Sequence, residues 1–206
     1  MTPVQALATK PTKGEETRAQ ILAAAVEMAS QCGFEALTIG SLAEKTGLSK
    51  SGLFAHFGSK QELQLAALDE AARQFTETVF LPALKAPRGV RRLKALHEAW
   101  LEWPRRQKLP GGCPMDAASR EYDHRPGPMR DAIMERQRQM ERECTKAVQM
   151  AIDTGELRND TDASQVAFEF LSIVLAFFRA ELVHGPEVAT RRARVAFDRL
   201  IEANRS

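Results

Sequence analysis

The chain has 206 residues, and its 29 Lys and Arg against 27 Asp and Glu leave a formal net charge of +2. Hydrophobic residues make up 44% of the chain and charged residues 27%, which are ordinary globular proportions and argue against wholesale disorder. The small net charge excludes a histone-like polycation but leaves room for a local basic face. The length suggests one large or two small domains, with a core that requires neither disulfides nor a metal.

Neither a secretion signal nor a membrane span is expected. No basic start precedes an apolar stretch at the N-terminus, and the longest apolar runs, such as Ile173 to Phe178, fall far short of the ~20 residues that a bilayer requires. Cys32, Cys113 and Cys144 are scattered without a CxxC pair, and no Cys/His cluster has metal-ligand spacing. We therefore predict a cytoplasmic protein that contacts no membrane and binds no metal or cofactor.

Helix signals follow one another along nearly the whole chain. Residues 1–14 carry no periodicity and are predicted to form a flexible arm, after which apolar residues recur at helical spacing. Strand signals are absent. Glycine and proline breaks divide the pattern into about nine helices, predicted at 15–32, 38–46, 49–57, 60–81, 88–103, 114–122, 128–154, 163–183 and 186–203. The fold class is therefore all-α, divided near residues 60 to 75.

A tight turn joins two short helices around residue 47. Gly47 supplies the positive φ that other residues resist, and Ala43 is small enough for the next helix to cross over it. The apolar wedge between the two helices is expected to consist of Leu42, Leu48 and Leu53. This pattern is typical of a helix-turn-helix.

The second helix of this pair carries the groups that would meet DNA. Ser49 is a good N-cap for it. The exposed N-terminal end, which in a helix-turn-helix enters the major groove, then consists of Lys50, Ser51 and Gly52. The motif therefore predicts a DNA-binding protein.

From Glu15 to Ala72 the sequence resembles the DNA-binding domain of the TetR family of bacterial transcriptional regulators. The motifs that carry the resemblance are Gly33-Phe34-x-x-Leu37-Thr38, Ile39-Gly40-Ser41-Leu42-Ala43-x-x-Thr46-Gly47-Leu48-Ser49-Lys50 and Leu53-Phe54-x-His56-Phe57-x-Ser59-Lys60. The rest of the chain is similar to the family only in length and helical character. The resemblance implies a three-helix DNA-binding domain at 15–75, with the helix-turn-helix at about 38–57, and a larger helical domain at 76–206 for effector binding and dimerisation.

The resemblance also implies which residues contact DNA. They are Thr38, Ser49, Lys50, Ser51, Gly52, Phe54, His56 and Lys60. Lys50 would face base edges or phosphates, and Thr38 would direct its hydroxyl and amide at a phosphate. Phe54 stands where the family usually has tyrosine, so a phosphate hydrogen bond is expected to be missing there. Lys45, Lys50 and Lys60 add positive charge with no acid between residues 45 and 60, which favours an affinity that falls with salt.

For the second domain the resemblance implies an inducer pocket, and no residue identifies the inducer. The candidates are polar and aromatic residues on otherwise apolar helices, namely His97, Trp100, Trp103, Cys113, Arg120, Tyr122, Phe177 and Arg179. Arg179 would suit a carboxylate ligand, with a salt-bridged interface residue as an equal alternative. Cys113 precedes a helix N-terminus, where a thiolate is stabilised, but a buried or idle thiol is the favoured interpretation.

The resemblance implies a homodimer on a palindromic operator in double-stranded DNA, and we expect the last two long helices to form its interface. Their proposed apolar faces are Ala163, Ala167, Phe170, Leu171, Val174 and Phe178 on the first helix and Val195, Leu200 and Ile201 on the second. The favoured function is a repressor that a small molecule releases from DNA. The alternatives are a ligand-independent regulator, a thiol-responsive regulator using Cys113 and, remotely, a helical enzyme, although no GxSxG, P-loop, GxGxxG or HExxH motif occurs.

Overall fold

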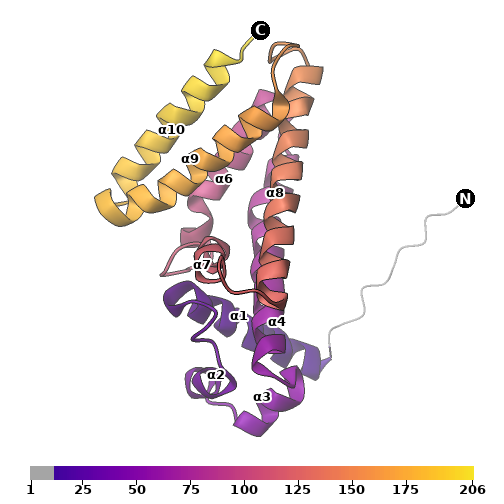
Figure 1. Cartoon of the computed structure of the whole chain (residues 1–206), viewed down its shortest axis with the longest axis vertical. Helices are drawn as coiled ribbons and strands as arrows, with labels where there is room; N and C mark the ends of the chain where they lie inside the picture. The colour runs from indigo at the N-terminus through magenta and orange to yellow at the C-terminus, as the bar shows by residue number, and fades with distance from the viewer. Residues whose placement is uncertain (1–11) are drawn as a thin grey trace, which may run out of the picture.

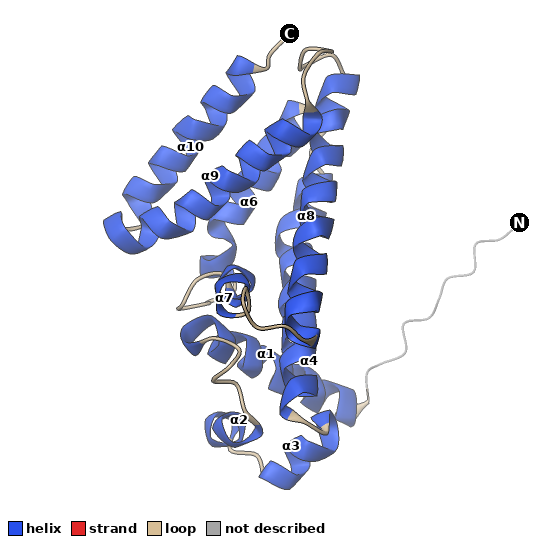
Figure 2. Cartoon of the chain, in the orientation of Figure 1, coloured by secondary structure: helices blue, strands red, loops and turns tan. Residues whose placement is uncertain are grey.

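The computed structural model describes residues 12–206, and these are helical through most of their length (Figures 1 and 2). The elements are α1 (Lys13–Cys32), α2 (Ile39–Thr46), α3 (Lys50–Phe57), α4 (Lys60–Phe75), η1 (Thr76–Phe80), α5 (Leu81–Leu84), α6 (Val90–Arg106), α7 (Pro114–Glu121), α8 (Pro128–Asp153), α9 (Ala163–His184) and α10 (Pro186–Ala203). Within residues 12–206 there is no strand, only one bridge between Leu157 and Arg205. The all-α prediction is confirmed. Because α4, η1 and α5 follow one another without a break, they correspond to one predicted helix.

Several helix boundaries differ from the prediction by one to three residues, and two of these differences have a clear physical cause. The first helix begins at Lys13, because the Thr12 side chain and Glu15 form a reciprocal capping box; residues 1–11, the rest of the predicted arm, lie outside the described residues. Helix α6 passes through Pro104 and ends at Arg106, where the sequence predicted a stop at residue 103. Trp103 and Pro104 are both buried, so packing maintains the last turn despite the hydrogen bond that a proline cannot donate.

The helices form an elongated molecule with α2 and α3 at one end and the α9–α10 hairpin near the other (Figure 1). Helix α8 runs along α4 for much of the length, and α7 lies between α1 and the upper helices (Figure 1). The segment from α4 through α5 therefore reaches from the DNA-binding motif into the larger domain. Across residues 12–206 no helix is long and apolar enough to cross a membrane.

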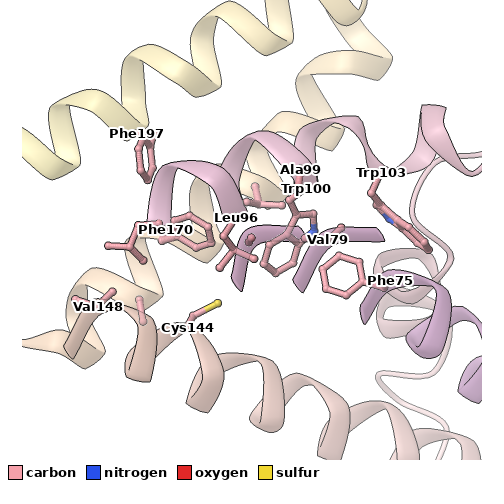
Figure 3. Close-up of a cluster of buried hydrophobic side chains, with 14 of the residues drawn as sticks. Phe75, Val79, Leu96, Ala99, Trp100, Trp103, Cys144, Val148, Phe170 and Phe197 are labelled. Carbon is pink, nitrogen blue, oxygen red and sulfur yellow. The ribbon is translucent and has the colours of Figure 1, made fainter. Parts of the chain in front are cut away.

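Two large hydrophobic clusters fill the molecule. The larger cluster has an aromatic centre, in which the Phe75 ring meets those of Trp100 and Trp103 edge-on at centroid distances of 4.8 and 5.3 Å (Figure 3). The smaller cluster belongs to α1–α4, but it also takes in Tyr122 and, from α8, Met129 and Ile133. The core of the DNA-binding motif is thus completed by residues beyond the predicted domain boundary.

Candidate DNA-binding surface and ligand cavity

Local hydrogen bonds shape the turn between α2 and α3 as the sequence predicted. Thr38 caps α2: its Oγ1 accepts from the Ser41 amide at 3.0 Å, and Ser41 Oγ accepts from the Thr38 amide at 2.9 Å. Gly47 ends α2 in the left-handed conformation, with φ 70°. Ser49 caps α3, where its Oγ accepts from the Gly52 amide at 3.1 Å. These caps satisfy amides that a helix leaves unpaired at its start.

The wedge between the two helices has two of its three predicted members. Leu42 and Leu53 are fully buried, whereas Leu48 is 40% exposed. Leu48 lies in the turn itself and on neither helix, which leaves its side chain at the surface. Its place in the wedge was therefore predicted wrongly.

The N-terminal end of α3 is exposed to solvent. Ser49, Lys50, Ser51 and Gly52 are all exposed, and Phe54 one turn later is 56% exposed. Lys50 has no carboxylate within ion-pair distance among the described residues. Its side chain lies across the start of α2, where a Cβ added to Gly40 would be 4.0 Å from Lys50 Nζ. An ammonium group beside a helix N-terminus favours an anion such as a phosphate.

Two other lysines of this region, Lys45 and Lys60, form ion pairs with carboxylates that lie outside residues 45–60. Lys45 Nζ is 3.0 Å from Glu27 of α1, and Lys60 Nζ is 2.7 Å from Glu35 of the α1–α2 loop. Folding therefore pairs two of the three lysines with carboxylates from preceding segments, although no acid lies between residues 45 and 60. The hydrogen bond from Lys60 also holds the pKa of Glu35 below its ordinary value, so this carboxyl is ionised near neutral pH.

The remaining predicted DNA contacts are constrained by their surroundings. The Thr38 amide donates to Ser41 Oγ at 2.9 Å, so a phosphate contact from this amide would have to replace that hydrogen bond. His56 is half-buried, with its ring 6.2 Å from that of Phe57.

A cavity of about 880 Å³ lies among α4, η1, α5, α8 and α9, with α6 and α7 contributing to its wall. Its lining is mainly apolar and includes Phe75, Phe80, Met115, Met140 and Leu171. This volume is within the range of small-molecule sites, which are also predominantly apolar. Of the predicted pocket residues, Trp100 and Cys113 line this cavity.

Six predicted pocket residues lie elsewhere, which corrects the prediction for His97, Trp103, Arg120, Tyr122, Phe177 and Arg179. Three of these are buried in packing that leaves them no access to the cavity. His97 stacks on Phe197 with ring centroids 4.5 Å apart, Trp103 belongs to the aromatic centre, and Phe177 packs in a small cluster with Leu101. Polar or aromatic character on an apolar helix face therefore did not identify most of the cavity lining.

The other three take part in surface or interdomain contacts. Arg179 is exposed on α9, and Arg120 forms an ion pair with Asp116 at 2.7 Å. The Tyr122 hydroxyl donates to Glu35 at 3.2 Å. Burial, with the charges of Glu121 and Glu35, raises the pKa of Tyr122, so its hydroxyl keeps its proton as a donor.

The sequence signals for the actual lining were present on the α8 segment. Ile133, Met134 and Met140 line the cavity, but large apolar residues on a helix also form a core, so they do not by themselves indicate a cavity. The contribution of η1, through Thr76 and Phe80, had no signal, because the wider turn is not visible in helical periodicity.

The arginines that line the cavity already have acidic partners. Arg73 pairs with Glu70 and Glu77 at 2.6 Å each, Arg136 pairs with Asp69, and Arg138 lies 3.7 Å from Glu135. The Nε of Arg136 has no hydrogen-bond partner, but it is buried. An anionic ligand would have to displace a carboxylate from its arginine, whereas an uncharged ligand would leave these ion pairs intact.

Two of the three cysteine thiols are buried. Cys113 and Cys144 are buried, and Cys32 is exposed. Burial raises the pKa of Cys113 and raises that of Cys144 to about 12, so both are protonated thiols at neutral pH and poor nucleophiles. Within residues 12–206 no group of three His, Cys, Asp or Glu side chains is placed to hold a metal ion.

The predicted dimer face of α9 is turned into its own chain. Ala167, Phe170 and Val174 are buried in the larger cluster, as are Leu200 and Ile201 of α10. The exposed large apolar residues on these helices are Phe168, Leu175, Leu182, Val183 and Val195, and of these only Val195 belongs to the predicted face. Because α9 is apolar on most sides, its sequence alone did not show which side faces the core.

A helix-turn-helix joined to a larger set of helices is an arrangement typical of bacterial DNA-binding regulators. The family described as "Bacterial regulatory proteins, tetR family" matches residues 21–67, and "Tetracyclin repressor-like, C-terminal domain" matches residues 89–197. The chain belongs to the TetR family, as its sequence suggested.

Two curated relatives are similar to the N-terminal part. The "HTH-type transcriptional repressor AcnR" of Corynebacterium efficiens is 39% identical over 67 residues, which cover 32% of this chain and 36% of AcnR. The "HTH-type transcriptional activator FasR" of Mycolicibacterium smegmatis is 33% identical over 89 residues, covering 43% of this chain and 41% of FasR. The chain thus matches well under half the length of these relatives.

Solved structures share the whole fold. A TetR-family regulator from Cytophaga hutchinsonii has a TM-score of 0.81 at 18% identity, covering 96% of this chain and 98% of its own. A regulator from Saccharomonospora viridis in complex with choline has a TM-score of 0.74 at 22% identity, covering 92% and 97%. AibR, in complex with isovaleryl coenzyme A and operator DNA, has a TM-score of 0.70 at 22% identity, covering 89% and 98%.

Proposed function

We propose that this protein is a transcriptional regulator that binds operator DNA through α3 and acts as a repressor. The observation that carries the proposal is the exposed start of α3, where unpaired Lys50 lies across the N-terminus of α2. Lys50, Ser51 and Gly52 would meet base edges or phosphates, and Thr38, His56 and Lys60 would meet phosphates. Ser49 would position the first of these by capping α3. The N-terminal part is similar to the repressor AcnR at 39% identity and to the activator FasR at 33%, and the higher identity to AcnR favours a repressor.

The operator-binding form is proposed to be a homodimer. Phe168, Leu175 and Leu182 recur every seven residues along α9 and are 55–78% exposed, and Val195 of α10 is also exposed. A seven-residue apolar stripe suits helix-on-helix association, and a two-fold dimer would match a palindromic operator. The protein would act in the cytoplasm, where the chromosome is, and its role would be regulatory, not enzymatic.

The effector is proposed to be an uncharged, mainly apolar small molecule that binds the cavity and releases DNA. The apolar lining and the internally paired arginines support this class over a carboxylate. Ligand complexes of two structural neighbours support small-molecule control in general, without identifying the molecule.

DNA binding can be tested by selecting bound duplexes from a randomised pool with the full chain. We expect enriched sequences to be inverted repeats whose half-sites lie about one helical turn, ~34–36 Å, or a multiple of it apart. The enriched duplex should bind at least ~10³-fold more tightly than a scrambled one. Lys50→Ala should weaken this binding, while Lys94→Ala, an exposed lysine on α6, should not. Recovery of no preferred sequence would contradict the proposal.

The effector class can be tested with Nile red, a neutral apolar dye that fluoresces on transfer from water. Met140→Gln in the cavity wall should weaken dye binding, and Met150→Gln, on α8 but outside the lining, should leave it unchanged. Dodecanol should displace the dye at lower concentration than dodecanoate, which carries the same chain and a negative charge. Stronger displacement by dodecanoate would show that the cavity prefers anions.

A further inference from the structure

Helix α7 connects the two sites of the molecule. Its first turn and the residue before it contribute Cys113, Met115 and Asp116 to the cavity wall. Its last residue, Glu121, contacts the loop between α1 and α2, and Met115 packs against both hydrophobic clusters. One short helix thus has one end at the cavity and the other at the DNA-binding motif.

The carboxylate of Glu121 binds the α1–α2 loop through two backbone amides. Its Oε2 accepts from the Phe34 amide and its Oε1 from the Glu35 amide, both at 2.8 Å. Gly33 makes room for it, because a Cβ at that position would lie 2.8 Å from Oε1. The carbonyl of Phe34 is held as well, by Gln64 Nε2 of α4 at 2.6 Å. Both sides of this loop are therefore held by side chains distant in sequence.

A second carboxylate extends the contact to the start of α4. Glu35 accepts from Lys60 Nζ at 2.7 Å and from the Tyr122 hydroxyl at 3.2 Å, and Arg125 lies 3.7 Å away. Tyr122 and Arg125 belong to the segment after α7, whereas Lys60 is a proposed phosphate contact. The cation that would meet DNA is thus shared with groups of the larger domain.

The loop before α7 is docked equally tightly on α1. Ser30 Oγ donates to the Gly112 carbonyl at 2.9 Å and accepts from the Gly111 amide at 3.1 Å. A Cβ at Gly111 would lie 1.7 Å from the Ser30 carbonyl oxygen, so only glycine permits this approach. Because this contact is close and polar, a shift of α7 would either break it or move α1 and the loop after α1 as well.

We propose that Glu121 and Glu35 form a two-carboxylate latch that transmits movement of α7 to the helix-turn-helix. This inference rests on the proposed function. A ligand in the cavity displaces the first turn of α7, Glu121 withdraws from the Phe34 and Glu35 amides, and the α1–α2 loop moves relative to α4, which separates Glu35 from Lys60. The ligand acts only through its different affinities for the latched and unlatched arrangements.

The latch itself is tested by hydrogen exchange at the Phe34 and Glu35 amides in the full chain. Glu121→Gln should accelerate exchange at these two backbone amides at least tenfold, because the glutamine side chain has one acceptor oxygen and cannot replace both carboxylate oxygens. Asp123→Asn is the matched control: it neutralises an exposed carboxylate two residues away and should leave exchange unchanged. Should Glu121→Gln fold poorly, Glu121→Asp keeps the charge and shortens the reach, with the same expected acceleration. Unchanged exchange in the folded variant would overturn the latch.

Transmission is tested by adding Nile red and following the same amides. Dye in the cavity should accelerate their exchange in the unmodified chain and have less than a twofold effect in Glu121→Gln. A bound dye that leaves these amides unaffected would overturn the proposal. Failure of the dye to bind would contradict the proposed ligand site. In that case Met115→Trp displaces α7 in place of the dye, and it should accelerate exchange at the Phe34 and Glu35 amides in the same way.

DNA titrations separate this proposal from the function on which it rests. In the unmodified chain the selected operator should weaken dye binding several-fold, and in Glu121→Gln this factor should fall below two. If the unmodified chain binds no DNA sequence preferentially, the proposed function fails while the exchange experiments still decide whether the latch exists. If the chain binds its operator and Glu121→Gln retains the full factor, the latch fails and the regulator stands.

Discussion

The DNA-binding motif and the ligand cavity are built in opposite ways. The motif depends on contacts between residues close in sequence: Thr38 and Ser49 each cap a helix through the amide three residues later. The cavity depends on side chains from α4, η1, α5, α6, α7, α8 and α9, with no single segment supplying more than a part of its wall. A locally encoded site tolerates little variation in residue type, whereas a site assembled from many helices can change its lining while the fold persists.

The cavity half of the molecule should be the more sensitive to acid, because it buries His97. Both ring nitrogens lack partners, and burial lowers the pKa of His97 to about 4, below the ~6.5 of an unfolded chain. Between these values the unfolded state binds more protons, so the contribution is complete above pH 6.5 and is lost as the pH falls towards 4. The loss should be on the order of 3 kcal/mol.

Urea unfolding at a series of pH values measures this effect. His97→Leu should remove most of the fall in unfolding free energy between pH 6.5 and 4, while His124→Gln, at an exposed position, should retain it. An unchanged pH dependence in His97→Leu would mean that other groups govern the acid sensitivity.

The junction between the two halves should be the next most sensitive place. Gly33→Ala adds a methyl group at φ 81° and against the Glu121 carboxylate, so we expect destabilisation of about 1–3 kcal/mol. Gly112→Ala is the matched control, since φ there is 85° but nothing lies within 4 Å of the added Cβ. Thermal unfolding should show a larger loss for Gly33→Ala; equal losses would assign the whole effect to backbone strain.

Within the DNA-binding motif, the paired and unpaired lysines should behave differently. Lys50→Ala should weaken operator binding by about 1–3 kcal/mol and alter the preference at one base position. Lys60→Ala should weaken specific and non-specific binding alike and reduce the salt slope by about one, because it removes one phosphate contact. Anisotropy titrations over a range of salt concentrations distinguish the two. A base-specific effect of Lys60→Ala would reverse their proposed roles.

The smallest expected effect is a gain of affinity at Phe54. The ring is 56% exposed beside the recognition end of α3, so Phe54→Tyr places a hydroxyl where a phosphate can accept from it. We expect tighter operator binding by about 0.5–1.5 kcal/mol. The same titration checks this, with Phe57→Tyr as a contrasting change at a buried ring. Unchanged or weaker binding by Phe54→Tyr would show that residue 54 does not face the backbone of DNA.

The sequence by itself determined the all-α class, most helix boundaries and the local geometry of the motif. Thr38, Gly47 and Ser49 could be interpreted correctly because a cap or a left-handed turn involves atoms within about three residues. The same reasoning covered the exposure of Lys50, which follows from its place at the first turn of α3.

Only the tertiary structure decided which distant groups meet. Helix α9 is apolar on most sides, so periodicity did not show that Phe170 faces inward and Phe168 outward. The sequence did not show that Lys60 forms an ion pair with Glu35, which lies 25 residues earlier. It also did not show that Glu121 accepts from the Phe34 and Glu35 amides. The physical reason is that ion pairs, cavity walls and carboxylate–amide contacts depend on how helices cross, which side-chain character along one helix does not specify.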